Sequence, residues 1–274
     1  MSIRVISLDD RAARLLEAGG DWSLHARFER ALILARTGDG TLVSLVRHDL
    51  PDGPFTARLD RTSPYDLRQV SAPPRLDLHG AVRWRARPVT AAGAVGPAEL
   101  ARRLDLLERR ATLSPGLERG IAAVASAASL AGLESALAAG DAGAAATAAG
   151  PLAGLGPGLT PSGDDLLAAA LAFGAWVETA GLAAPGSGLR AAVVAAALPR
   201  TTRLAGQLLA AAADGEVTAP LAGLLEALLR LGATAPPDPA PLLAIGETSG
   251  ADMLAGVRLA GRAWRLAAAV VPVV

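Results

Sequence analysis

The stretch Gly154–Phe173, with the sequence GLGPGLTPSGDDLLAAALAF, decides how the second half of the chain folds. Gly156 and Gly158 open a loop in which backbone N–H groups can approach a ligand closely. Thr160 followed by Pro161 predicts a helix start, with a hydroxyl at the N-cap and proline at the first helical position. The mostly apolar residues that follow predict a buried helix.

Polar residues fill the first turn of this predicted helix, namely Ser162, Gly163, Asp164 and Asp165. Exposed amides and the helix dipole favour an anion at a helix N-terminus. The two carboxylates would repel a free anion, recruit a metal ion or accept a substrate N–H group. The alternative interpretation is an ordinary capped helix start without a ligand.

A second copy of the pattern lies near the end of the chain, in Gly246–Ala255, with the sequence GETSGADMLA. Ser162, Gly163 and Asp165 of the first copy correspond to Ser249, Gly250 and Asp252 of the second, where Thr248 precedes the serine. We expect the two helix starts to face one pocket. A chance match in a chain rich in alanine, leucine and glycine is the alternative.

The composition excludes several classes of chemistry. The chain has 274 residues and no cysteine, so disulfides and thiolate sites are absent. All 26 basic residues are arginine, which excludes Schiff-base and Walker-type lysine chemistry and leaves anion binding to guanidinium groups. The charges balance and aromatic residues make up only 3%, which argues against a nucleic-acid surface.

Targeting and membrane signals are also missing from the sequence. No apolar run reaches the length of about 20 residues that spans a bilayer. The start, MSIRVISLDD, lacks the apolar core of a signal peptide. We therefore expect a cytoplasmic protein that does not insert into a membrane.

The first hundred residues show strand signals. Ile3–Leu8, Phe55–Leu59 and Val82–Val89 are candidate strands, and Asp10–Ala18 is a candidate short helix. Two further apolar runs, 31–35 and 41–47, flank an Asp-Gly turn and predict a hairpin. This part predicts a β-rich unit, either a small barrel or a sandwich.

From Pro97 onward the hydrophobic period becomes helical. The predicted helices cover 97–110, 117–130, 133–139, 161–180, 188–198, 201–213, 219–231 and 249–270, with a Pro-rich loop at 235–241. Strands followed by helices predict the α+β class. We place the boundary between a β-rich domain, 1–96, and an Ala-rich helical domain, 97–274.

A third junction, Leu198–Arg203, has the sequence LPRTTR. Arg200, Thr201 and Thr202 combine a guanidinium, hydroxyls and a helix start, which is a good anion-binding set. A capped surface helix with solvated arginines is the alternative. The three histidines lack metal-ligand spacing, so we predict no zinc site, whereas Asp164, Asp165 and Asp252 leave Mg²⁺ open as a cofactor.

These junctions resemble the AllH family, in the segments GLGPGLTPSGDD, RTT and the late GETSGADMLAG. The resemblance extends from about Gly154 to Gly261. Glu247 stands where the family's late motif more often has histidine. The family is associated with the three-component oxamate carbamoyltransferase of anaerobic allantoin breakdown, so the resemblance implies partner transferase subunits and a small anionic substrate such as carbamoyl phosphate or oxamate.

The resemblance implies the reaction of oxalurate and phosphate to oxamate and carbamoyl phosphate, or its reverse, and carries over no catalytic residue. The alternative function is a non-catalytic protein that binds a small anion or scaffolds a complex. The candidate substrate-binding residues, taken from the residue patterns, are Gly156, Gly158, Thr160, Ser162, Gly163, Asp164, Asp165, Arg200, Thr201, Thr202, Thr248, Ser249, Gly250 and Asp252.

Overall fold

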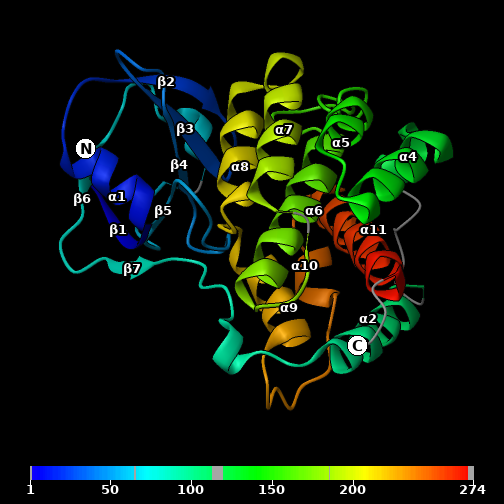
Figure 1. Ribbon diagram of the computed structural model, residues 1–274. Helices are drawn as coiled ribbons and strands as arrows, with labels where there is room; N and C mark the ends of the chain where they lie inside the picture. The colour runs from blue at the N-terminus through cyan, green and yellow to red at the C-terminus, as the bar shows by residue number, and fades with distance from the viewer. Residues whose placement is uncertain (1, 65, 113–119, 185, 271–274) are drawn as a thin grey trace. The chain divides into compact units, whose positions relative to one another are not determined.

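The computed structural model describes residues 2–64, 66–112, 120–184 and 186–270. The chain divides into two compact units, Met1–Ala86 and Arg87–Val274. The first carries the sheet and the second carries the helices from α2 onward (Figure 1). The predicted α+β class is confirmed.

The first unit is built on one mixed sheet of seven strands. Its strands are β1 (Ser2–Asp9), β2 (Trp22–Arg27), β3 (Ala31–Arg36), β4 (Leu42–Val46), β5 (Thr56–Leu59), β6 (Arg75–Asp77) and β7 (Val82–Trp84). The order is β2-β3-β4-β5-β1-β6, and β7 also pairs with β1. The sequence analysis left open whether this unit is a small barrel or a sandwich. In its described part, the structure has this single mixed sheet.

The register of the sheet follows from its turns. The predicted Asp-Gly hairpin joins the antiparallel strands β3 and β4, while β4 pairs with β5 in parallel. Helix α1 (Asp10–Glu17) begins directly after β1, and the Asp9 carboxylate caps it by accepting the Arg11 and Ala12 amides. The predicted strand from Val82 to Val89 ends at Trp84, because its pairing with β1 stops at Asp9.

The second unit is built from helices joined by loops in its described part. Its helices are α2 (Pro97–Thr112), α3 (Ile121–Val124), α4 (Ala127–Ala139), α5 (Ala142–Ala149), α6 (Ser162–Thr179), α7 (Ser187–Ala197), α8 (Arg203–Ala213), α9 (Ala219–Leu229), α10 (Ala240–Leu243) and α11 (Ser249–Val270). Every named strand of the described chain lies before residue 87, as predicted, and one isolated bridge joins Ala94 to Arg230.

The helix boundaries differ most from the prediction around α3, α4 and α10. The predicted helices 117–130 and 133–139 are replaced by the short α3 and a longer α4, because the Ser126 hydroxyl caps a new helix by accepting the Ser129 amide at 3.1 Å. The predicted start at Leu117 lies outside the described residues. The loop predicted at 235–241 already enters α10 at Ala240.

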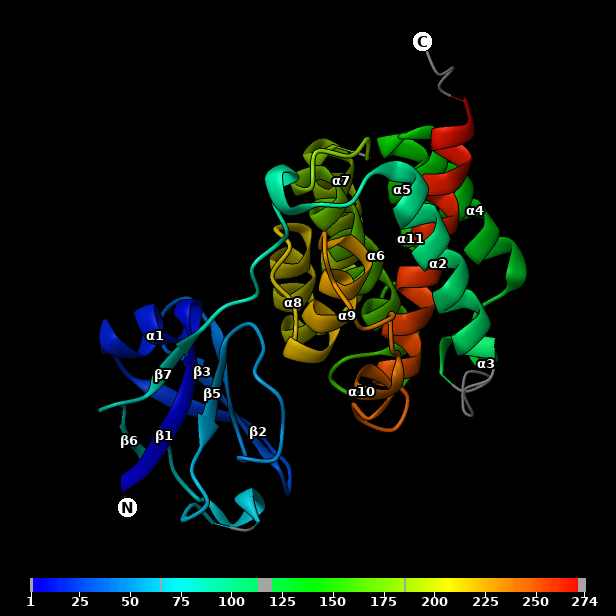
Figure 2. The same cartoon turned by 90° about the horizontal axis from the view of Figure 1, so that it is seen from below.

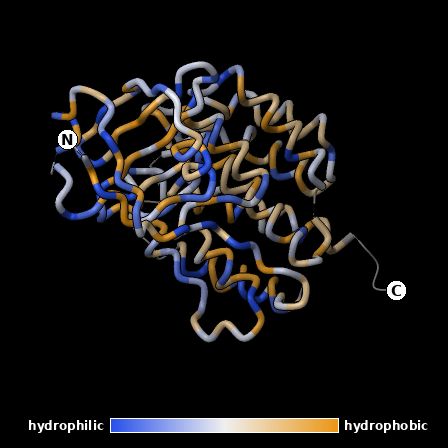
Figure 3. Tube along the Cα trace, turned by 90° about the vertical axis from the view of Figure 1, so that its left-hand side faces the viewer, coloured by the Kyte–Doolittle hydropathy of each residue, from blue (hydrophilic) through white to orange (hydrophobic). Residues whose placement is uncertain are grey.

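Helix α6 is the centre of the helical unit. It packs against α7, α8, α9 and α11, and it lies among these helices in both ribbon views (Figures 1 and 2). Nearly all of its residues are buried, which explains a sequence that is apolar on every face. Long stretches of helix are pale to deep orange in Figure 3, because they are rich in the hydrophobic residues alanine and leucine. No helix in the described chain has the length and apolar character to cross a bilayer.

Candidate functional site

The first predicted helix start lies one residue later than the sequence indicated. Helix α6 begins at Ser162, and Pro161 is its N-cap, without a side-chain capping bond. The prediction of Thr160 as the N-cap is therefore wrong. The physical reason is that the Pro161 carbonyl accepts the Asp164 and Asp165 amides at 2.9 and 3.1 Å, while the Gly163 amide donates to Leu155. The first-turn amides of Gly163, Asp164 and Asp165 are thus used inside the chain.

Asp164 and the third junction hold the loop before α6. The Asp164 carboxylate accepts the Gly154 amide at 3.2 Å and the Thr201 hydroxyl at 2.5 Å. The Thr202 hydroxyl donates to the Leu159 carbonyl at 2.5 Å and caps α8. The structure therefore joins Thr201 and Thr202 to the α6 start through bonds that fix the loop, whereas Arg200 is exposed.

The second copy repeats the local structure of the first. The Gly163 amide donates to Leu155 at 2.9 Å, and the Gly250 amide donates to Ile245 at 3.0 Å. At each of these glycines a Cβ atom would collide with a backbone carbonyl, that of Leu152 in the first copy and that of Leu242 in the second. The repeat seen in the sequence is therefore a structural repeat, and glycine is required at the same place in both copies.

The two copies meet where α6 and α11 cross. A Cβ on Gly256 would stand 3.0 Å from Ala169 Cβ and would collide with the Leu166 carbonyl, so the two backbones are nearly in contact. Ala169 and Gly256 each follow their motif aspartate by four residues. Equivalent positions of the two copies are therefore in contact at this crossing.

Serine and aspartate pair crosswise between the copies. Ser249 of the second copy lowers the pKa of Asp165 of the first, and Ser162 of the first lowers the pKa of Asp252 of the second, so each serine lies near the aspartate of the other copy. Asp252 also accepts the Ile121 amide at 2.6 Å. We call Asp165 and Asp252 the aspartate pair. Both side chains are buried, with 6% and 0% of their surface exposed.

Burial dominates the electrostatics of the site. Desolvation raises the pKa of Asp165 well above its ordinary value, and the charges of Asp252 and Asp164 raise it further against the hydrogen bond from Ser249. Desolvation also raises the pKa of Asp252, against the bonds from Ile121, Ser162 and Thr248. The pKa of Asp164 is likewise raised by burial, with the Thr201 and Gly154 bonds opposing.

One oxygen of each carboxylate in the aspartate pair has no hydrogen-bond partner among the residues that the structure describes, namely Oδ2 of Asp165 and Oδ2 of Asp252. A buried polar atom without a partner is costly, so such atoms call for an explanation. Burial and the charge of Asp252 favour the protonated form of the Asp165 carboxyl. Such a pair can donate one hydrogen bond and accept others.

The remaining predicted site residues lie on the loops of the two copies. Gly156 packs against Ser162, and Gly158 is exposed. Thr160 and Thr248 are half-buried, and Glu247 is exposed. No group of three or more His, Asp or Glu side chains in the described ranges is arranged to hold a metal ion. Mg²⁺ therefore stays a prediction that only the aspartate pair supports.

Sequence reasoning missed the segment that covers Asp252. Gly120 has a φ of +65°, and a Cβ there would collide with the Asp252 carboxylate. The Ile121 amide, which follows it, then points at Oδ1. A glycine directly before an apolar helical run was the available signal, but nothing in the sequence linked it to residue 252.

The comparisons with known proteins match a region that contains both copies. Residues 152–261 match the family model described as oxamate carbamoyltransferase subunit AllH. The match covers less than half of the chain, and it contains the starts of both α6 and α11. The resemblance to the AllH family is confirmed for this region. No curated protein and no solved structure matches the chain.

Proposed function

We propose, from the AllH match over residues 152–261, that this chain is a subunit of a carbamoyltransferase of the oxamate type. The family's description as a subunit supports partner chains in the same enzyme. We place the carbamoyl group of the substrate at the aspartate pair, because both members of the pair lie inside the matched region. The expected substrates are small anions that carry amide N–H groups, such as carbamoyl phosphate and oxamate.

The reaction sets clear demands on the site. A phosphate oxygen attacks the carbamoyl carbon of oxalurate, the bond from that carbon to the oxamate nitrogen breaks, and the phosphate proton ends on the oxamate nitrogen. Phosphate and oxalurate become carbamoyl phosphate and oxamate. A site must therefore accept the N–H groups of the carbamoyl unit and transfer one proton from the nucleophile to the leaving nitrogen.

The aspartate pair suits both demands. The unpartnered oxygen of an ionised carboxylate accepts a carbamoyl N–H. The protonated carboxyl of its partner gives a proton to the leaving nitrogen and regains one from the attacking phosphate. Positioning two reactants beside such groups is itself a large catalytic contribution. The observation that carries the proposal is that the two motif carboxylates are buried, that the charge of Asp252 acts on Asp165, and that each carboxylate keeps one unpartnered oxygen.

The test is titration calorimetry with carbamoyl phosphate, oxamate, phosphate and Mg²⁺ on the wild-type chain and on Asp165→Asn and Asp252→Asn. Asparagine keeps the size of the side chain but replaces one acceptor oxygen by a donor. We expect carbamoyl phosphate or oxamate to bind the wild type and to bind each variant at least tenfold more weakly, about 1.4 kcal/mol or more.

Asp141→Asn is the matched control, because Asp141 is an exposed aspartate that only caps α5 by accepting the Ala144 amide at 2.9 Å. Its ligand affinity should equal that of the wild type. Equal affinities for all four proteins would show that the aspartate pair is structural. That result would favour the alternative of a non-catalytic scaffolding protein. The hydrogen bonds that Asp164 and Thr202 make within the chain are compatible with this alternative.

A further inference from the structure

The aspartate pair is closed off from solvent in this structure. Asp252 has 0% of its surface exposed, and Asp165 has 6%. The oxygen without a partner, Oδ2 in each residue, is buried as well. A substrate N–H group therefore reaches the pair only after some part of the chain has moved away.

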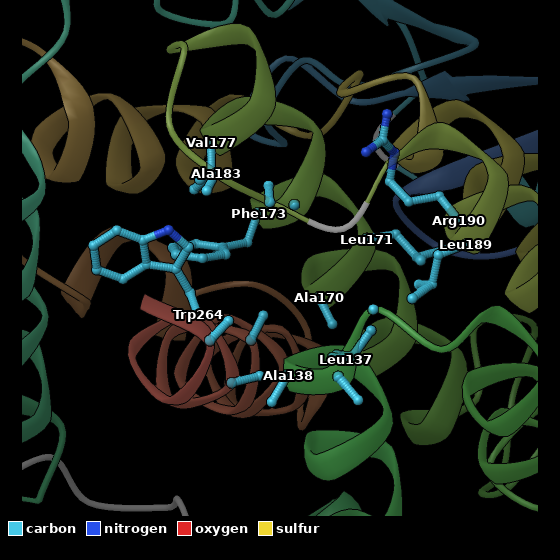
Figure 4. A pocket seen from close by; sticks show the side chains of 17 residues that line it. Leu137, Ala138, Ala170, Leu171, Phe173, Val177, Ala183, Leu189, Arg190 and Trp264 are labelled. Atoms are coloured by element: carbon cyan, nitrogen blue, oxygen red, sulfur yellow. The ribbon is translucent and has the colours of Figure 1, made fainter. Parts of the chain in front are cut away.

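The apolar cavity shown in Figure 4 does not provide that access. It lies between α4, α6, α7 and α11, and its lining on α6 begins at Ala170. Ala170 follows Asp165 by five residues, which is about 7.5 Å at 1.5 Å per residue. Neither aspartate of the pair lines this cavity. The access route is therefore sought on the side to which the Asp252 carboxylate points.

The segment 120–124, which we call the cover, lies over the Asp252 carboxylate. A Cβ atom on Gly120 would collide with both oxygens of that carboxylate, so the Gly120 backbone faces both of them. The Ile121 amide donates to Oδ1 of Asp252 at 2.6 Å. Both Asp252 oxygens, including the one without a partner, thus lie beneath the first two residues of the cover.

Few contacts hold the cover in place. It consists of Gly120 and α3, a helix of four residues that has no side-chain cap among the described residues. Ile121 is the one buried side chain of α3, with 2% exposed. The three side chains that follow it are exposed, namely Ala122, Ala123 and Val124. A short helix with little buried apolar surface can open locally while the rest of the protein stays folded.

The bond between the cover and Asp252 has the same chemistry as the bond that the substrate needs. A backbone amide and a carbamoyl group both offer an N–H donor, and a carboxylate oxygen accepts from either. The Ile121 amide occupies Oδ1 in this structure. A carbamoyl N–H that replaces the Ile121 amide at Oδ1 would leave Asp252 with a donor when the cover opens. This replacement limits the cost of opening, because the buried acceptor is not left without a partner.

We propose that the cover, residues 120–124, is a lid that the Ile121–Asp252 hydrogen bond holds closed, and that the carbamoyl N–H of the substrate displaces this bond and opens the lid. The inference rests on the proposed function, because it takes Asp252 as an acceptor of the carbamoyl N–H. The closed lid lowers the apparent affinity for substrate, since only the open fraction of the protein binds.

The first test uses oxamate and pyruvate, two ligands of equal charge and nearly equal shape in which an NH₂ group and a methyl group take the same place. Hydrogen exchange of the Ile121 amide is followed by ¹⁵N NMR in the free chain and with an excess of each ligand. We expect oxamate to speed this exchange about tenfold or more, because the amide loses its acceptor, and pyruvate to leave it unchanged. A purely structural segment would exchange no faster with oxamate than without it.

The second test compares Gly120→Ala with Gly140→Ala. Both glycines have a φ of +65°, so the two substitutions impose the same backbone strain. A Cβ at position 120 collides with the Asp252 carboxylate, whereas a Cβ at position 140 meets nothing within 4 Å. Gly120→Ala should therefore push the cover away and bind oxamate about tenfold more tightly in calorimetry, while Gly140→Ala should bind like the wild type.

The outcomes separate this proposal from the proposed function. Binding of oxamate without faster exchange at Ile121, or an affinity of Gly120→Ala no higher than that of Gly140→Ala, would overturn the lid and leave the proposed function standing. If neither the wild type nor Gly120→Ala binds oxamate, the proposed function fails and the lid fails with it. Circular dichroism checks the fold of Gly120→Ala, and if that variant is unfolded, the exchange measurements on the wild type decide alone.

Discussion

The crossing of α6 and α11 can be tested with a single methyl group, Gly256→Ala. Gly256 has ordinary helical geometry, so alanine gains about 1 kcal/mol of helix propensity locally. The new Cβ would stand 3.0 Å from both Ala169 Cβ and the Leu166 carbonyl carbon, and would collide with that carbonyl's oxygen. Carbon atoms in good contact lie about 3.5–4.0 Å apart, so the helices must separate by about 0.5–1 Å. Such overpacking costs about 1–3 kcal/mol.

Gly223→Ala is the matched control, because Gly223 lies exposed inside α9 and a Cβ there meets nothing within 4 Å. The control should gain up to about 1 kcal/mol, and Gly256→Ala should be about 1–3 kcal/mol less stable than the control. This difference corresponds to about 2–12 °C in the melting temperature, followed by helical circular dichroism at 222 nm. If Gly256→Ala melts at or above the temperature of Gly223→Ala, the close crossing is wrong.

Three further outcomes are expected. Between the ordinary Asp pKa of 3.8 and the raised native pKa of Asp165, the native state holds a proton that the unfolded chain has lost, so stability falls as pH rises. Urea midpoints across acidic pH should therefore fall less in Asp165→Asn than in wild type; parallel curves would contradict this. Thr201→Val leaves Asp164 without its 2.5 Å hydroxyl donor and should cost about 1–3 kcal/mol of unfolding free energy, measured in urea; a cost near zero would contradict the loop-holding role. Trp176→Phe, which breaks a buried bond, should lower the melting temperature more than Trp264→Phe, which breaks none among the described residues; the reverse order would contradict the assignment.

Much of the fold followed from periodicity and turn residues. The Asp-Gly turn placed β3 and β4, and the apolar periodicity of residues 249–270 placed α11 at its observed bounds. Strand β2 was missed although Trp22–Arg27 alternates between half-buried and exposed residues, because the pattern is short and weakly apolar. Strand β6 has three residues and exists through its pairing with β1, so no local signal marked it.

The site was predictable in part. The repeat identified the equivalent serines, glycines and aspartates, but not the effect of Ser162 on the pKa of Asp252, which depends on how α6 crosses α11. Gly256 was the one available hint, since a glycine inside a helix often marks a close approach. Thr160 is not the N-cap, because the Gly163 amide donates to the Leu155 carbonyl and this bond fixes the first turn. Residue propensities alone do not predict such a bond.

The distance along the chain between the two halves of the aspartate pair has a consequence for synthesis on the ribosome. Asp165 and Asp252 are separated by 87 positions, and α11 is the last helix described. At about 5–20 residues per second, the start of α6 is made roughly 4–17 s before its partner. During that interval a carboxylate destined for burial stays hydrated and ionised. Completion of the site, and the proton uptake that burial of its carboxylates favours, therefore wait until α11 has been made.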